Sequence, residues 1–144
     1  MAPATVYLET TVLSYLTARD ARDEIIAAHQ SVTRTWWESQ RQQYRVVASA
    51  VVVREAGAGD PEMAAKRLAL IANCDLLQIT DAVETLAARL VARGLVPATV
   101  PNDALHIAVT TVGGVEYLLT WNLRHLAGSG RPSPDRARAS PTGV

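Results

Sequence analysis

The chain has 144 residues, 14 basic and 14 acidic side chains, and a formal net charge of zero. This length is typical of a single domain with its own core, and the neutral charge gives no support for nucleic-acid binding through global electrostatics. No run of about 18 apolar residues indicates a membrane span, and no basic stretch before a long apolar segment indicates a secretory signal. Cys74 is the only cysteine, which excludes an internal disulfide and fits a reducing, cytoplasmic compartment.

Short apolar runs alternate with segments of helical periodicity along the chain. Ser49 and Asp60-Pro61 are typical helix starts, because a capping side chain or a first-turn proline suits the first turn. In chain order the expected elements are a strand at 4–8, a helix at 11–17, a helix capped by Asp20 that reaches about Tyr44, a strand at 46–49, a helix that carries Glu55, a helix from 61 to 71, a strand at 76–79, a helix capped by Thr80 or Asp81 that ends at Gly94, a helix from 101 to Gly113, and a strand at 117–120.

This alternation predicts an α/β fold with a short, mostly parallel sheet of four or more strands and helices on both faces. Open sheets of this kind place their sites beyond the carboxyl ends of the strands. Four polar residues fall near those ends: Glu9 after the first strand, Glu55 in the helix after the second, Asp103 at the start of the helix before the fourth, and Asn122 after the fourth. We therefore expect them to meet at one edge of the sheet.

Acidic side chains gathered in one pocket repel one another, so at least one holds a proton unless a cation is present. Hard divalent ions such as Mg²⁺ or Mn²⁺ prefer oxygen ligands, and Mg²⁺ usually keeps several waters. A bound ion of this kind activates water and stabilises negative charge on a phosphate. The pattern is therefore compatible with phosphodiester hydrolysis without a protein nucleophile.

Three segments resemble PIN-domain nucleases. Residues 9–16, ETTVLSYL, look like the opening of that family, where an acid, a hydroxyl pair and an apolar helix begin the fold. Residues 103–108, DALHIA, look like its third acidic motif, and 119–126, LTWN followed by RHL, look like its fourth. Glu55 falls where the second acid lies. The resemblance covers about residues 6–127 and is closest to bacterial toxins of the VapBC type and their stand-alone relatives.

The resemblance implies a three-layer α/β/α domain and a Mg²⁺- or Mn²⁺-dependent endoribonuclease. It also implies a homodimer and, in the toxin branch, a cognate antitoxin that blocks the site. Single-stranded RNA is the expected substrate, because its bases can be splayed and read. The implied site comprises Glu9, Asp103 and Asn122 as metal ligands, Glu55 completing the acidic pocket directly or through water, Thr11 or Thr120 as supporting hydroxyls, and Arg124 and His125 as candidate RNA contacts.

The chain departs from the family pattern at two site positions and at its end. The first acid in the family is most often Asp, and Glu9 is one methylene longer. The fourth is commonly Asp, and Asn122 brings an oxygen ligand without charge. Residues 128–144 are Gly, Ser, Pro and Arg without apolar periodicity, so we expect a flexible tail after a PIN-like domain of residues 1–127.

Each site residue also has an ordinary structural interpretation. Asp103 suits a helix N-terminus because of the helix dipole, and Asn122 suits a turn after a strand. Glu9 is also compatible with an ordinary first-turn acid of the following helix, and Glu55 with an ordinary helix acid, and we expect His106 to be structural. The alternative functions are a PIN-like RNA- or protein-binding module without a metal and, more remotely, a small phosphatase on another doubly wound fold.

Overall fold

The computed structural model describes residues 2–122, and the fold is stated for these residues alone. The tail expected at 128–144 and the candidate RNA contacts Arg124 and His125 lie outside this range. Within residues 2–122, no helix has the length and apolar character needed to cross a membrane.

Each of the first three strands is followed by two α-helices, so short strands and helical segments succeed one another as the sequence pattern predicts. The strands are β1 (Thr5–Leu8), β2 (Arg45–Ser49), β3 (Asp75–Leu77) and β4 (Tyr117–Leu119). The α-helices are α1 (Thr10–Thr17), α2 (Glu24–Ser39), α3 (Ala50–Ala56), α4 (Pro61–Leu70), α5 (Asp81–Ala92) and α6 (Pro101–Val112). A single 3₁₀ turn, η1 (Arg41–Gln43), separates α2 from β2.

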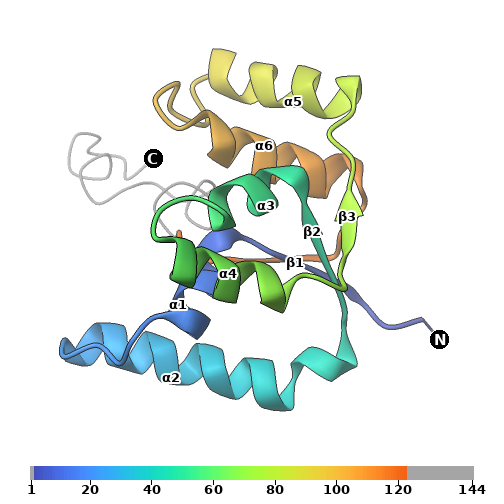
Figure 1. Ribbon diagram of the computed structural model, residues 1–144. Helices are drawn as coiled ribbons and strands as arrows, with labels where there is room; N and C mark the ends of the chain where they lie inside the picture. Colours follow the sequence, from blue (N-terminus) through green and yellow to red (C-terminus); the bar gives the residue numbers. More distant parts are fainter. Residues whose placement is uncertain (1, 123–144) are drawn as a thin grey trace, which may run out of the picture.

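All strand pairs of the described sheet are parallel, in the order β3-β2-β1-β4. Strand β1 lies inside the sheet, where Val6 pairs with Val46 on one side and with Tyr117 on the other. Helices α5 and α6 pack together on one side of the sheet, and α1, α2 and α4 lie on the other side (Figure 1). The fold is therefore a three-layer α/β/α arrangement, which confirms the predicted class.

Several helices begin where the sequence predicts a cap. The side chains of Ser49, Asp60 and Thr80 accept backbone N–H groups in the first turns of α3, α4 and α5. These bonds satisfy donors that have no partner within the helix itself. The cap at Ser49 also fixes where β2 ends and where the helix carrying Glu55 begins.

The prediction for the second helix is wrong at both ends. Asp23, not Asp20, caps α2, because its side chain accepts the Ile26 N–H at 2.9 Å. Asp20 instead pairs with Arg34 at 2.8 Å. The helix also stops before Tyr44, since the chain turns through η1 to pair β2 with β1.

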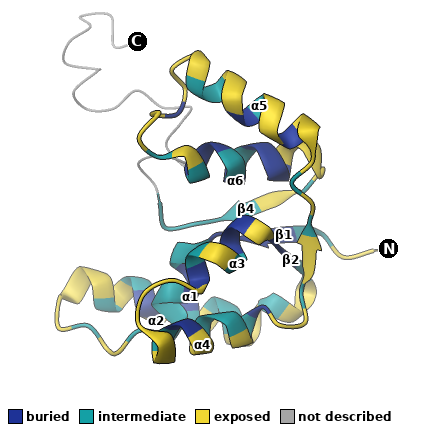
Figure 2. Cartoon of the chain, turned by 45° about the horizontal axis from the view of Figure 1, so that its top comes forward, coloured by how far each residue is buried: buried dark blue, intermediate teal, exposed yellow. Residues whose placement is uncertain are grey.

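The core lies around the two central strands (Figure 2). Tyr7, Leu8, Val47 and Ala48 are all buried. Parallel strands covered by helices on both faces require such continuous apolar runs. Strands β3 and β4, at the two edges of the described sheet, are more exposed.

The order of the sheet reverses at β1, because β2 and β3 extend it on one side and β4 returns on the other. Such a switch leaves a crevice beyond the carboxyl ends of the two flanking strands. The Glu9 amide donates to the Leu119 carbonyl at 3.1 Å, so β1 and β4 end side by side. Gly114, at φ +66°, makes the tight turn between α6 and β4, a conformation that a side chain disfavours.

Candidate metal centre

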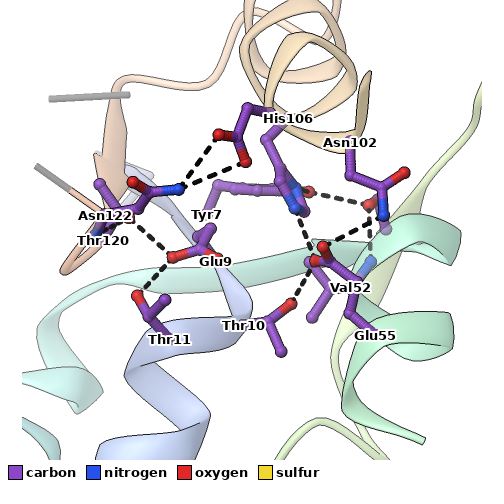
Figure 3. A network of polar contacts seen from close by, with 12 residues as sticks. Tyr7, Glu9, Thr10, Thr11, Val52, Glu55, Asn102, His106, Thr120 and Asn122 are labelled. Atoms are coloured by element: carbon purple, nitrogen blue, oxygen red, sulfur yellow. Dashed lines mark hydrogen bonds and ion pairs between the residues drawn. The ribbon is translucent and has the colours of Figure 1, made fainter. Parts of the chain in front are cut away.

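Glu9 follows β1 at the N-cap position of α1, but its side chain does not cap that helix. It is 4% exposed, and its Oε1 accepts the hydroxyls of Thr11 and, at 2.7 Å, Thr120 (Figure 3). The Trp121 amide donates to Thr11 Oγ1 at 2.9 Å, and the Asn122 amide donates to Thr120 Oγ1 at 2.8 Å. These amides leave each hydroxyl hydrogen directed at Glu9. The carboxylate is therefore held from both sides of the switch between β1 and β4.

Glu55 lies on α3 and accepts three side-chain donors. Its Oε1 accepts His106 Nε2 at 2.7 Å and Thr10 Oγ1 at 2.6 Å, and its Oε2 accepts Asn102 Nδ2 at 3.2 Å. Burial raises the pKa of Glu55, but these donors outweigh that effect and hold the pKa below its ordinary value. Glu55 is consequently an ionised, acceptor-only carboxylate at neutral pH.

Asp103 lies in the first turn of α6 and is 8% exposed. The Asn122 amide nitrogen lies 3.3 Å from its Oδ1 and 3.2 Å from its Oδ2. The side chain beyond β4 thus presents a donor to the acid on α6. Asn122 is connected to Glu9 as well, through its backbone amide and the Thr120 hydroxyl.

The two glutamates and His106 form one tight group. One ligand atom from each of Glu9, Glu55 and His106 lies within 4.8 Å of the others. Figure 3 shows Glu9 near the middle of the network, with Asn122 on one side and Glu55 on the other. Two carboxylates at this separation repel each other unless a proton or a cation intervenes.

In each glutamate carboxylate, one oxygen accepts more hydrogen bonds than the other. In Glu9 and in Glu55, Oε1 accepts two side-chain donors. Among residues 2–122, no donor reaches Oε2 of Glu9, and only Asn102 reaches Oε2 of Glu55. Since a carboxylate oxygen accepts about two hydrogen bonds, both Oε2 atoms keep capacity for a ligand. This donor set fits a hard divalent cation.

The four residues predicted to meet at the sheet edge divide into two pairs. Glu9 and Glu55 lie together in the tight group, whereas Asp103 and Asn122 contact each other. The two hydroxyls expected to support a ligand, Thr11 and Thr120, both donate to Glu9.

Sequence reasoning missed the part that His106 plays at the site. One signal was available: Asn102 and His106 are four residues apart, so they lie on the same face of the predicted helix. In the structure both donate to Glu55. The hydroxyl of Thr10 gave a second signal, since it immediately follows Glu9 in sequence. Tyr7 gave none, because its contact with His106 spans 99 residues.

An aromatic cluster holds the end of β4. The Trp121 ring stacks on His29 with centroids 4.2 Å apart and 14° between planes, and Tyr15 packs edge-on against both rings. The Trp121 indole also donates to Thr33 Oγ1 at 2.8 Å. Because Trp121 lies between Thr120 and Asn122, this cluster fixes both site residues against α1 and α2.

No model of a known protein family and no curated protein sequence matches the chain, so its candidate centre rests on its own geometry and motifs.

Proposed function

We propose that this protein is a divalent-metal-dependent endoribonuclease of the PIN type. The observation that carries the proposal is the approach of Glu9 and Glu55, each with an Oε2 atom that keeps acceptor capacity. The position of this pair beyond the carboxyl ends of β1 and β2 supports it, because open α/β sheets bind ligands there. The likeness of residues 9–16 and 103–108 to the motifs of PIN nucleases supports the same activity.

In this proposal Glu9 and Glu55 hold Mg²⁺ or Mn²⁺, and Asp103 and Asn122 complete the pocket. Such a cation supplies Lewis acidity toward a phosphate oxygen and lowers the pKa of its bound water. The low exposure of Glu9 and Asp103 strengthens their attraction for a cation, because the local dielectric is lower than in water. Thr120 keeps the Glu9 carboxylate oriented. Attack of water at phosphorus then leaves a 5′-phosphate and a 3′-hydroxyl on the RNA.

The proposal extends to a cytoplasmic toxin that acts as a homodimer and is blocked by a cognate antitoxin. The motif resemblance supports this role. In addition, α2 exposes Ile25 (69%) and Val32 (60%), seven residues apart and therefore on one helix face. An exposed apolar face of this kind suits contact with another protein. The RNA contacts expected at Arg124 and His125 stay predictions.

One observation favours a metal-free RNA- or protein-binding module as the second candidate. Asn122 donates to both oxygens of Asp103, and two hydroxyls fill Oε1 of Glu9. Much of the polar pocket is therefore satisfied by the chain itself. Such a module would bind no Mn²⁺ and cut no RNA.

Cleavage of a labelled, structured RNA tests the enzyme against the module. We expect cutting with Mn²⁺ that is lost in EDTA and lost in Asp103→Asn. Asp81→Asn is the matched control, because Asp81 also lies in the first turn of a helix but is exposed. Cutting that persists in Asp103→Asn would contradict the proposed site. No cutting, combined with no rise of the wild-type Tm in Mn²⁺, would favour the binding module.

A further inference from the structure

His106 is fully buried and lies between two hydrogen-bond partners. Its Nε2 lies 2.7 Å from Glu55 Oε1, and its Nδ1 lies 2.6 Å from the Tyr7 hydroxyl. The Tyr7 hydroxyl in turn lies 2.8 Å from Ser49 Oγ, which accepts the Val52 amide at 3.4 Å. A continuous chain of hydrogen bonds therefore runs from the first turn of α3 to Glu55 (Figure 3).

The two ends of this chain fix its direction. At one end the Val52 N–H can only donate, so Ser49 Oγ accepts from it. Within residues 2–122 the Tyr7 hydroxyl is the one acceptor in contact with Ser49 Oγ, so the Ser49 hydrogen points to Tyr7. Tyr7 then donates to Nδ1 of His106. At the other end the Glu55 carboxylate can only accept, so His106 Nε2 carries a hydrogen. The Glu55 end assigns a hydrogen to Nε2, and the Ser49 end assigns an accepting Nδ1. Taken together, the two ends give the neutral imidazole with its hydrogen on Nε2.

We infer that His106 is a positioning residue, which donates Nε2–H to Glu55 and does not ligate the metal. The consequence for metal binding rests on the proposed function, whereas the hydrogen-bond direction does not. A ligating Nε2 must lose its hydrogen, which would move to Nδ1 and reverse the hydroxyls of Tyr7 and Ser49. The Ser49 hydrogen would then have no acceptor within residues 2–122, because both contacts of Ser49 Oγ, the Tyr7 hydroxyl and the Val52 N–H, would be donating to it.

The His106 Nε2–H determines which carboxylate oxygen of Glu55 remains available to a metal ion. His106 and Thr10 together fill Oε1, and Asn102 takes only part of the capacity of Oε2. A free glutamate side chain samples many rotamers, and ordering it costs free energy. His106 removes that freedom before a cation arrives, as groups that hydrogen-bond a metal-ligating carboxylate do. It also joins α6, which carries Asp103, to the carboxylate on α3.

Nitrogen NMR of ¹⁵N-histidine-labelled, metal-free protein tests the hydrogen-bond direction. The chain has three histidines, and the His106→Gln spectrum identifies the signals of His106. We expect Nε2 to carry hydrogen and Nδ1 to carry none. A hydrogen on Nδ1, in the other tautomer or in the cation, would overturn the inference whether or not the protein binds metal.

Two variants and pulsed EPR test the consequence for the metal. The amide nitrogen of Gln reaches the position of Nε2, whereas that of the shorter Asn corresponds to Nδ1. We expect His106→Asn to weaken Mn²⁺ binding by about 10- to 100-fold relative to the wild type, the usual range for groups that orient a metal ligand. We expect His106→Gln, with a Tm similar to that of His106→Asn, to bind Mn²⁺ almost as tightly as the wild type. Mn²⁺ bound to the wild type should show no directly bonded nitrogen.

The two proposals fail in different ways. A directly bonded nitrogen in the EPR spectrum, or equal losses in the Gln and Asn variants, would overturn the positioning role while leaving the nuclease proposal intact. Absence of Mn²⁺ binding and of RNA cleavage in the wild type would overturn the nuclease proposal. The NMR result would still decide the direction of the His106 hydrogen bond.

Discussion

Asn122 places its amide nitrogen 3.2 and 3.3 Å from the two carboxylate oxygens of Asp103. A neutral donor at this position offsets part of the cost of burying the Asp103 carboxyl group, which is 8% exposed. An aspartate at this position would instead set a second negative charge opposite the first. Compared with an aspartate, Asn122 therefore brings a hydrogen-bond donor and no negative charge, which stabilises the metal-free form of the pocket.

Asn122→Asp should destabilise the metal-free protein and tighten Mn²⁺ binding. The substitution replaces a hydrogen bond with a like charge, so we expect a loss of about 1–3 kcal/mol in the free energy of unfolding in EDTA. The added carboxylate should lower the Kd for Mn²⁺. Urea denaturation and Mn²⁺ titration measure the two effects. Asn73→Asp, at an exposed position, is the control, and equal stability of the Asn122 variant in EDTA would contradict the argument.

Glu55 should contribute stability that disappears in acid. Its pKa is held below the ordinary value of 4.5 in the folded protein, despite burial, by His106, Thr10 and Asn102. The unfolded chain therefore binds this proton first as the pH falls. The contribution is fully present above pH 4.5 and is lost as the pH falls through the lower folded-state pKa.

Urea unfolding in EDTA across the acid range measures this contribution. As the pH is lowered, the free energy of unfolding of the wild type should decrease more steeply than that of Glu55→Gln. Glu24→Gln, which changes an exposed first-turn acid of α2, should follow the wild type. Superimposable curves for Glu55→Gln and the wild type would show that the three donors do not favour the ionised carboxylate.

Local signals explain how much of the fold could be predicted. Apolar runs identified the strands, and caps such as Ser49 identified helix starts, because both depend on neighbouring residues. The same reasoning failed at Asp20, since two aspartates three residues apart both suit a cap and only the tertiary pairing with Arg34 separates them. Local signals therefore predict that an element exists more reliably than where it begins.

The candidate site was predictable as a set of positions but not as a set of contacts. Parallel strand order brings Glu9 and Asn122 to one edge, and this follows from topology. The direction of the Asn122 side-chain amide depends on Asp103, 19 residues away, and the role of His106 depends on Tyr7, 99 residues away. The sequence favours a structural role for His106, and it contains no information about Tyr7 at the other end of the bond.

Thr120→Val should weaken both the fold and the site. The Thr120 hydroxyl donates to Glu9 and accepts the Asn122 amide, so valine leaves two polar groups without this partner. We expect a loss of about 1–3 kcal/mol in the free energy of unfolding together with weaker Mn²⁺ binding. Thr111→Val is the control, because the exposed Thr111 hydroxyl bonds within residues 2–122 to no group except the Ile107 carbonyl in its own helix. Unchanged Mn²⁺ affinity in Thr120→Val would show that the Thr120 hydroxyl does not contribute to metal binding.

The stacking of Trp121 on His29 should contribute to Mn²⁺ binding at the proposed site as well as to stability. Trp121→Ala removes the ring contacts with His29 and Tyr15 and the bond to Thr33. Because Trp121 is half-buried, we expect a loss of about 2 kcal/mol, less than for a fully buried tryptophan.

Trp121→Phe separates the two contributions, since it keeps an aromatic ring but removes the indole N–H. It should lose only about 1 kcal/mol, the usual net value of one hydrogen bond, and should keep its Mn²⁺ affinity. Trp121→Ala should bind Mn²⁺ more weakly than Trp121→Phe, because Thr120 and Asn122 lose their common anchor on α2. Denaturation in EDTA and Mn²⁺ titration of the folded variants measure these quantities. Equal Mn²⁺ affinities for the two variants would mean that the aromatic cluster stabilises the fold without orienting the site.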